Sequence, residues 1–266
     1  MFQALDAGVE VSAGGHDREK EQEEMLTALR ERLQGPAGRQ AAEQLVSGGE
    51  LSFEDDLFSE LYLRRWLRAR VWNLDEAEKS LLSHAEWRVN MMPEGRVQAA
   101  EVENELASKK VFLLGADKFG RGLLLIQAQH HNAWRRNLEE LERFCCYSLD
   151  ATIAACDLRL NPKGQIAVIL DLTNLGTVSM DIPAVRKLFR LLGDHYVERL
   201  GQMVMYNPPL IFWGAWNTLS PLLPAATKKK ILLVNSQDTA ALVEVVGSAA
   251  LPVEYGGIVV KYAPMC

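Results

Sequence analysis

Cysteine is scarce in this sequence and shows no pairing pattern. The 266 residues contain four cysteines, and no two of them have a C-x-x-C spacing. Small disulfide-stabilised scaffolds are much richer in cysteine, so we expect buried or free thiols in a reducing compartment. The first sixteen residues contain neither the basic segment nor the apolar segment of a secretory signal. The sequence therefore predicts a cytoplasmic protein.

The sequence also lacks an apolar run long enough to cross a bilayer, which requires roughly 20 residues. The longest candidate begins at Leu210 and is interrupted by Gly214, Asn217 and Pro221. We therefore expect no membrane-spanning segment. A net charge of −6 argues against nucleic acid as a partner, because such binding needs a basic face that displaces counterions from phosphates.

Motifs of catalysis and metal binding are absent from the sequence. It contains no G-x-S-x-G, no G-x-x-x-x-G-K-[ST] and no H-E-x-x-H pattern, and its few histidines have no metal-ligand spacing. The sequence thus predicts a protein that is not an enzyme and needs neither a metal nor a cofactor.

The N-terminal part of the chain has a helical pattern. We expect a flexible tail over residues 1–16 and a helical subdomain over residues 17–95, in which apolar residues recur at helical spacing. Capping residues and glycine or proline stops delimit its helices. The four expected helices run from Asp17 to Gly35, from about Arg39 to Val46, from Ser52 (with Asp55 three residues on) toward Arg70, and from Asn73 to Pro93.

From residue 96 to about residue 260 the pattern alternates between short apolar strands and helices. Residues 166–170 are apolar without interruption, as in a central strand covered on both faces. Alternation of this kind predicts an α/β domain with a mostly parallel sheet and crossover helices. The expected strands are 110–114, 123–126, 166–170, 202–206 and 231–234, and the expected helices are 137–157, 181–196, 210–223 and 238–246.

An apolar segment and a cationic segment are neighbours between Tyr196 and Val234. Nearly every large residue from Leu210 to Leu223 is apolar, and three lysines follow at 228–230. A buried core helix is one explanation of the apolar segment. Trp213 and Trp216 cannot share one narrow face with the other apolar residues, however, so such a helix is either wholly buried or shared between a cavity and a membrane. The combination suggests a ligand with apolar tails and a charged headgroup.

The charged residues near this segment each have a structural and a functional interpretation. Arg68 and Arg70 stabilise the end of a helix, or grip a phosphate with their planar donors. The lysine run favours solubility or binds an anion. Glu198 is a solvated turn charge, or it accepts hydrogen bonds from sugar or inositol hydroxyls. Composition alone leaves these alternatives open.

A set of motifs in one register resembles the CRAL-TRIO lipid-binding family, and in particular its yeast-type phosphatidylinositol/phosphatidylcholine transfer proteins. The resemblance extends from about residue 20 to residue 257. The motifs are Tyr62-Leu-Arg-Arg-Trp-Leu-Arg-Ala-Arg70, Asn73-Leu-Asp-Glu-Ala77, Asp117-Lys-Phe-Gly-Arg121, Ile169-Leu-Asp-Leu172, Tyr196-Val-Glu-Arg-Leu-Gly201, Tyr206-Asn-Pro208 and Leu251-Pro-Val-Glu-Tyr-Gly-Gly257.

The resemblance implies an α/β fold in which a helical N-terminal subdomain precedes a mixed, mostly parallel sheet, with flanking helices that enclose a hydrophobic lipid cavity. It implies that the helix from Leu210 to Leu222 is a mobile gate. It also implies that a phosphatidylinositol headgroup is held by Arg70, Glu198, Thr227 and Lys230. The expected gate and cavity residues are Leu210, Ile211, Phe212, Trp213, Trp216, Leu219, Ile166, Val168 and Leu124.

The sequence departs from the family pattern at two places. Val197 stands where the usual turn has proline, which leaves Glu198 in register. Apolar residues (Leu124, Ile166 and Val168) occupy positions at which the yeast-type proteins bind phosphatidylcholine. We therefore expect a monomer that binds phosphatidylinositol or a phosphoinositide and exchanges it for a second hydrophobic ligand at a membrane surface. A lipid kinase is a further candidate partner, and two alternatives stay open: a membrane-recruited interaction module, and a carrier of a non-phospholipid ligand.

Overall fold

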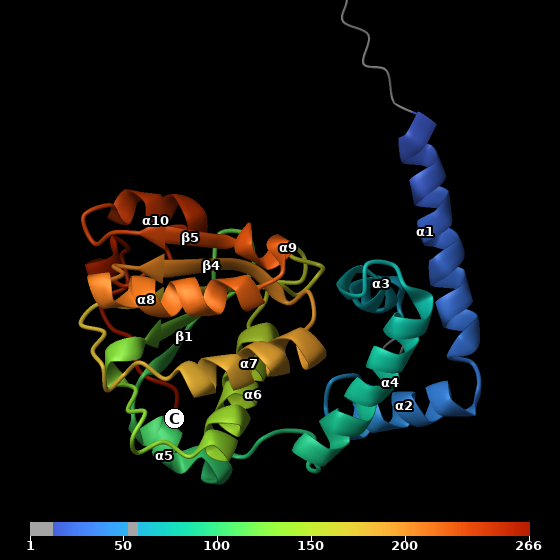
Figure 1. Cartoon of the computed structure of the whole chain (residues 1–266), viewed down its shortest axis with the longest axis horizontal. Helices are drawn as coiled ribbons and strands as arrows, with labels where there is room; N and C mark the ends of the chain where they lie inside the picture. Colours follow the sequence, from blue (N-terminus) through green and yellow to red (C-terminus); the bar gives the residue numbers. More distant parts are fainter. Residues whose placement is uncertain (1–12, 53–57) are drawn as a thin grey trace, which may run out of the picture.

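The computed structural model describes residues 13–52 and 58–266 of the chain and has two parts (Figure 1). A helical subdomain lies to one side of an α/β domain, and the chain passes from one to the other near residue 95. The helices of the subdomain are α1 (Ala13–Arg32), α2 (Pro36–Ser47), α3 (Glu60–Ala69) and α4 (Leu74–Met91).

Local sequence explains most boundaries of these helices. Pro36 occupies the first turn of α2, where its missing N–H costs nothing. The Asn73 side chain accepts a hydrogen bond from the Glu76 N–H at the start of α4 (3.1 Å). Two expected starts are wrong. The first helix begins at Ala13 and not after Asp17, and the third begins after Ser59, whose hydroxyl accepts from the Tyr62 N–H (3.3 Å), and not after Ser52. Asp55 and residues 1–12 lie outside the described residues.

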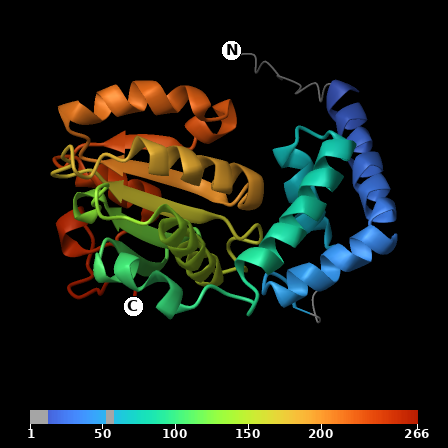
Figure 2. The same cartoon turned by 60° about the horizontal axis from the view of Figure 1, so that its bottom comes forward.

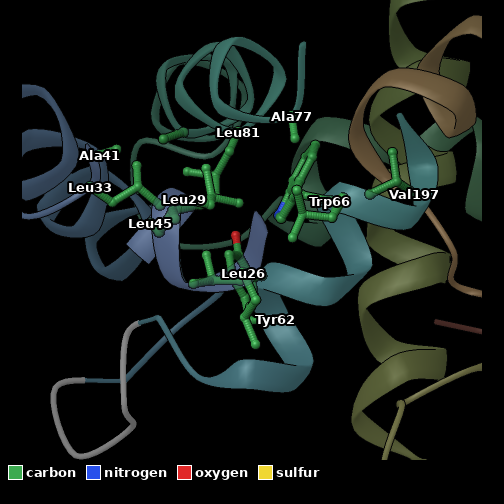
Figure 3. Close-up of a cluster of buried hydrophobic side chains, with 13 residues drawn as sticks. Leu26, Leu29, Leu33, Ala41, Leu45, Tyr62, Trp66, Ala77, Leu81 and Val197 are labelled. Carbon is green, nitrogen blue, oxygen red and sulfur yellow. The ribbon is translucent and has the colours of Figure 1, made fainter. Parts of the chain in front are cut away.

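The helical subdomain has its own apolar core, drawn in Figure 3. Trp66, Leu29 and Leu81 are fully buried at its centre. Val197 of the α/β domain is 4% exposed and packs into the same core. Burial of apolar surface stabilises the folded state by about 25 cal/mol per Å², so this cluster fixes the subdomain against the rest of the chain.

The α/β domain follows the predicted order of strands and helices. Predicted and observed strand ends agree within about two residues, and Asn137, Asp181 and Asp238 cap their helices as expected. The strands are β1 (Val111–Ala116), β2 (Gly122–Gln127), β3 (Ile166–Asp171), β4 (Leu200–Tyr206) and β5 (Ile231–Val234). The longer helices are α6 (Leu138–Ala154), α7 (Ile182–His195), α8 (Leu210–Leu219) and α10 (Thr239–Val246).

Several short helical segments were not expected from the sequence. A helix of three to five residues makes too few hydrogen bonds to form on propensity alone, so tertiary contacts decide where it occurs. The unexpected segments are η1 (Ala99–Val102), α5 (Glu103–Ala107), η2 (Ala128–His130), η3 (Ser220–Leu222), α9 (Ala225–Lys228) and η4 (Val253–Tyr255). The apolar helix predicted over 210–223 is accordingly divided into α8 and η3.

In the described part of the chain the strands form one sheet in the order β1-β2-β3-β4-β5. β1 pairs antiparallel with β2, and the other pairs are parallel, which confirms the mixed, mostly parallel sheet. The register places one residue of each strand in a row across the sheet. This row consists of Leu113, Leu124, Val168, Met203 and Ile231.

The two faces of the sheet have different covers, because side chains alternate between them along each strand. The face that contains the row is covered by α6, α7 and α8, and we call it the inner face (Figures 1 and 2). The opposite face packs against α10 and the C-terminal segment, through residues such as Ile169, Leu242 and Tyr255. Within residues 13–52 and 58–266, every helix is too short or too polar to cross a bilayer.

Candidate functional site

The turn between α7 and β4 brings four consecutive side chains to different partners. The Tyr196 hydroxyl donates a hydrogen bond to Asp150 of α6 (3.0 Å). Val197 enters the core of the helical subdomain, Glu198 faces Lys230, and Arg199 lines a cavity between the two parts of the molecule. The sharp change of direction requires an unusual backbone: Glu198 has φ of +56°, a left-handed conformation that is costly for residues other than glycine.

Glu198 and Lys230 form an open ion pair at the edge of the α/β domain. Lys230 Nζ lies 3.6 Å from Glu198 Oε2, and their side chains are 25% and 31% exposed. The distance is longer than a good charge-assisted hydrogen bond, and exposed pairs of this kind contribute about 0–1 kcal/mol. Both charges therefore remain available to a ligand at little cost.

Hydrogen bonds to the first half of β4 and to the short helix α9 hold the backbone of Lys230 in place. The Lys230 carbonyl accepts hydrogen bonds from the Met203 N–H (2.8 Å) and from the Gln202 side chain (2.9 Å). The Lys230 N–H donates to the carbonyl of Thr227, one turn earlier (3.0 Å). The structure thus brings Glu198, Thr227 and Lys230 together, as the resemblance implied, while Lys228 and Lys229 are exposed.

Arg70 lies apart from this group. Its Nε donates to the Ser80 hydroxyl (2.7 Å), and its Nη1 lies 3.4 Å from the carbonyl of Gly193 near the end of α7. Among the described residues no contact joins Arg70 to Glu198 or Lys230. Arg70 instead lines a cavity of about 280 Å³ with Lys79. In this conformation Arg70 ties α3 to the end of the helix that leads into the turn.

Helix α8 is apolar around most of its circumference, but only part of it is buried. Phe212 and Leu219 are 6% and 8% exposed, and Phe212 packs against Leu172 and Met205 of the α/β domain. Leu210 is 90% exposed and Trp213 is 40% exposed. Ile211 is also exposed, and Trp216 is half-buried with its ring stacked on Phe212 (5.7 Å between centroids). Complete burial, one of the explanations left open by the sequence, is therefore wrong for this helix.

The inner face of the sheet is closely packed at some positions and only partly buried at others. Leu124, Ile166 and Val168 are nearly fully buried and contact α6. Leu170 and Met203, on the two central parallel strands, are only half-buried although helices cover this face. Both side chains therefore keep some contact with solvent.

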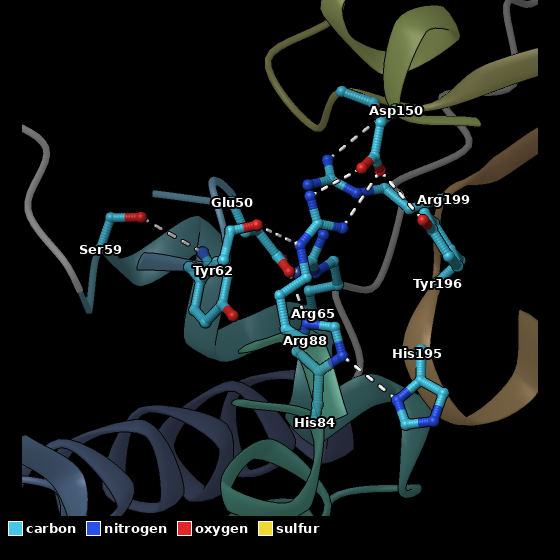
Figure 4. A network of polar contacts seen from close by, with 12 residues as sticks. Glu50, Ser59, Tyr62, Arg65, His84, Arg88, Asp150, His195, Tyr196 and Arg199 are labelled. Carbon is cyan, nitrogen blue, oxygen red and sulfur yellow. Dashed lines mark hydrogen bonds and ion pairs between the residues drawn. The ribbon is translucent and has the colours of Figure 1, made fainter. Parts of the chain in front are cut away.

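A polar network that the sequence analysis did not predict joins the helical subdomain to the α/β domain (Figure 4). Glu50 is paired with Arg65 (2.7 Å) and with His84 of α4. Arg88 donates two hydrogen bonds to Asp150 of α6 (2.7 and 3.2 Å). One feature could have revealed it: Arg88 follows Leu81 and Ala85 at helical spacing, which places a charge on the buried face of α4.

His195, at the end of α7, extends this network through its contact with His84. His195 Nδ1 lies 3.3 Å from His84 Nδ1, and its ring stacks on Trp87 with centroids 3.8 Å apart and planes at 8°. Burial, together with the nearby His84, lowers the pKa of His195 to about 4. Burial would raise the pKa of Glu50, but His84 and Arg65 outweigh burial and hold that pKa well below its ordinary value.

The fold and the site geometry agree with one family. The model of the CRAL/TRIO domain matches residues 106–257, which is more than half of the chain. The chain belongs to the CRAL/TRIO domain family. This confirms the resemblance seen in the sequence motifs, and lipid binding is the property shared by that family.

Individual relatives are distant. The chain is 28% identical over 247 residues to the phosphatidylinositol transfer protein CSR1 of Eremothecium gossypii, covering 88% of this chain and 53% of the relative. It is 26% identical over 178 residues to the CRAL-TRIO domain-containing protein C3H8.02 of Schizosaccharomyces pombe, covering 64% and 39%. Human clavesin-2 is 26% identical over 209 residues, with 76% and 62% covered. The chain therefore spans between 39% and 62% of the length of these curated relatives.

A solved structure supports the same fold. The crystal structure of Sfh5 superposes with a TM-score of 0.69, covering 90% of this chain and 88% of that chain, at 14% sequence identity. The predicted CRAL-TRIO-like α/β fold with N-terminal helices is thereby confirmed.

Proposed function

We propose that this CRAL/TRIO-family chain binds phosphatidylinositol, or a monophosphorylated form of it, and exchanges it at membranes for a second hydrophobic ligand. The observation that carries the proposal is the position of Glu198, Thr227 and Lys230 beside a sheet face whose apolar side chains remain accessible. A phospholipid needs both features, because its headgroup is charged and its acyl chains are apolar.

The headgroup contacts follow from the chemistry of the three residues. The Lys230 ammonium is a compact charge for a phosphate, and the Glu198 carboxylate accepts hydrogen bonds from inositol hydroxyls. The Thr227 hydroxyl can donate or accept. Phosphatidylcholine offers no ring hydroxyls to Glu198, and its trimethylammonium group would bring a further positive charge near Lys230. These charges therefore favour the inositol lipid.

Arg70 completes the headgroup site only if α3 or the end of α7 shifts. Its present partners are one hydroxyl and two backbone carbonyls, and no carboxylate neutralises its guanidinium among the described residues. A phosphate would be a stronger acceptor than any of these. The proposal thus includes a change of Arg70 partners when lipid binds.

The acyl chains occupy the accessible part of the inner face, below α7 and α8. Each CH₂ group removed from water contributes about 0.8 kcal/mol, so a lipid-sized cavity can compete with a bilayer for the chains. Helix α8 acts as the gate: Phe212 closes the cavity, and the exposed Leu210 and Trp213 enter the membrane interface when it opens. Pro208 and Pro209 before α8 and Gly214 within it are the expected hinge positions.

A relative supports this choice of ligand. CSR1 of Eremothecium gossypii is named a phosphatidylinositol transfer protein and aligns with 88% of this chain. The proposal places the chain in the cytoplasm, at the periphery of membranes, and requires no catalytic step.

The test is direct lipid extraction followed by a transfer assay. The purified full chain is incubated with mixed vesicles, re-isolated and analysed by mass spectrometry for bound lipid, and phosphatidylinositol transfer between vesicles is compared with phosphatidylcholine transfer. We expect a stoichiometric inositol lipid and faster transfer of it. A consistently empty protein would contradict lipid carriage, and equal transfer of the two lipids would contradict the headgroup assignment.

A further inference from the structure

A second cavity, of about 600 Å³, lies between the helical subdomain and the α/β domain. Its walls come from both parts: Glu50, Arg65 and Arg88 from the first, and Asp150 and Arg199 from the second. It is distinct from the inner face of the sheet and from Lys230. Its size is in the range of small-molecule sites.

The cavity carries an excess of positive charge. Among the described residues that line it, four are arginines (Arg65, Arg88, Arg96 and Arg199) and two are carboxylates (Glu50 and Asp150). The two carboxylates are already used, since Glu50 pairs with Arg65 and Asp150 pairs with Arg88. Arg96 is exposed at the cavity and forms no ion pair with any described residue.

Arg199 is a partly buried cation that forms no ion pair with any described residue. Among the described residues its guanidinium bonds only to two backbone carbonyls, of Lys163 (3.3 Å) and Gly164 (3.2 Å), and both bonds come from Nη1. Its Nε and Nη2 donate to no described group. Burial, and next the neighbouring Arg65, lower the pKa of Arg199 to about 10. The surroundings of Arg199 therefore disfavour its charged form. A bound anion would stabilise that charged form.

Arg65 is a second cation at this cavity whose hydrogen-bonding capacity is not fully used. It is 5% exposed, and its Nε is buried without a hydrogen-bond partner. Buried donors are normally paired, and one that is not costs free energy. Figure 4 shows Arg65, Arg88 and Arg199, which come from three different elements, close together beside Glu50 and Asp150.

We propose that this cavity binds a phosphate-bearing anion, which bridges the helical subdomain and the α/β domain through Arg199, Arg65 and Arg96. Guanidinium groups favour phosphate because their parallel donors match its oxygens. The cavity accommodates more than one phosphate group. Two sources share this chemistry, a water-soluble phosphate ester and the headgroup of a phosphorylated lipid presented by a membrane.

The first arm of the test uses pyrophosphate as a soluble probe of the full chain, measured by calorimetry and by thermal melting in phosphate-free buffer. The second arm measures binding to phosphatidylcholine vesicles with and without a minor fraction of phosphatidylinositol 4-phosphate. The informative variant is Arg199→Gln, which retains an amide donor for the Lys163 and Gly164 carbonyls but removes the charge. Arg30→Gln, at an exposed position of α1, is the matched control.

We expect pyrophosphate or the phosphorylated vesicles to bind the wild type and the Arg30→Gln variant equally. Arg199→Gln should raise the dissociation constant about tenfold or more, since one charge-assisted contact is lost. Without ligand, Arg199→Gln should melt at the same temperature as the wild type or higher, because an unpaired cation has been removed. Binding in the first arm identifies a water-soluble phosphate ester as the source of the anion, and binding in the second arm alone identifies a lipid headgroup.

Two results would overturn the proposal. One is the absence of binding in both arms, and the other is binding to Arg199→Gln with wild-type affinity. The inference is independent of lipid carriage at Lys230, since Lys230 does not line this cavity. Loss of phosphatidylinositol transfer in a Lys230 variant would leave pyrophosphate binding unchanged.

Discussion

Lys230 Nζ lies 3.6 Å from Glu198 Oε2, although the two residues belong to different crossover connections of the sheet. The parallel pairing of β4 with β5 places the start of one strand beside the start of the other, so the turn before β4 meets the end of α9. The topology of the sheet thus assembles the headgroup site that we propose.

The central prediction concerns the lysine run. Lys230→Ala should reduce phosphatidylinositol transfer between vesicles at least tenfold, because a charge-assisted contact with phosphate is lost. The melting temperature should change little, since the pair with Glu198 contributes about 1 kcal/mol or less. Lys229→Ala is the control, because Lys229 is exposed and adjacent in sequence. Equal transfer by both variants would refute the assignment of Lys230.

The Glu198 carboxylate should matter for lipid binding and contribute little to stability. Glu198→Asn places a residue that tolerates the left-handed backbone at φ of +56°, which offsets the lost ion pair. We expect unfolding free energy within about 1 kcal/mol of the wild type and a clear loss of phosphatidylinositol transfer. Lys109→Asn, at another exposed left-handed position, is the control and should leave transfer unchanged. Retained transfer by Glu198→Asn would show that the carboxylate is not a ligand contact.

The gate helix should contribute to membrane contact through its most exposed side chain. Leu210 is 90% exposed, so Leu210→Ala should change unfolding free energy by less than about 0.5 kcal/mol. It should weaken vesicle binding about tenfold, since it removes three carbons that would enter the interface. Leu158→Ala is the control: Leu158 is 61% exposed and precedes β3, at the other end of the parallel strands. Equal weakening in both variants, measured by vesicle co-sedimentation, would contradict docking through α8.

Val197 should couple the two parts of the chain. Val197→Ala removes two methyl groups from the core of the helical subdomain and should lower unfolding free energy by about 1–2 kcal/mol. Amide hydrogen exchange in α3 should become faster as well, because Val197 packs beside Trp66 (Figure 3). Val260→Ala, at a position 81% exposed, should have no measurable effect. Unaltered exchange in α3 would mean that Val197 does not hold the subdomain.

The network between the two parts should make stability depend on pH. His195 has a folded pKa of about 4 and an ordinary unfolded pKa near 6.5, so between these values the unfolded chain binds more protons. Unfolding free energy should therefore fall as pH decreases from about 6.5 to about 4, by about 1–2 kcal/mol once solvent screening of the partly buried ring is considered. Glu50, whose pKa is depressed, adds a further loss below its ordinary pKa of about 4.5.

Denaturant unfolding at a series of pH values measures this dependence. His195→Gln should reduce the slope between pH 6.5 and 4, whereas His130→Gln should retain it, because His130 is exposed. An unchanged slope in His195→Gln would assign the dependence to other groups.

Much of the fold could be predicted from local patterns. The uninterrupted apolar run of β3 identified it as a central strand, and Asn73, Asp181 and Asp238 each cap the helix that was expected to follow them. The starts of the first and third helices were the exceptions. Ser52 and Ser59 both precede apolar residues, and sequence alone gave no reason to prefer the second.

The candidate site was predictable only in part. Motif register predicted that Glu198, Thr227 and Lys230 would be neighbours, and the structure places them so. It did not predict that Arg70 would bond to Ser80 and Gly193, because those partners come from a different helix and from the end of α7. The pairing of Arg88 with Asp150, and the unpaired state of Arg199, depend on residues far apart in the chain.

The sequence by itself therefore determined the alternation of strands and helices, the membership of the chain in a lipid-binding family and the candidate headgroup residues. These depend on periodicity, capping and motif spacing, which are local properties. Only the tertiary structure decided where the side chains of residues 196–199 point and which charges are neutralised between the two parts of the chain. A single left-handed residue, Glu198, redirects the backbone there, and the partners that each side chain meets are brought by other elements.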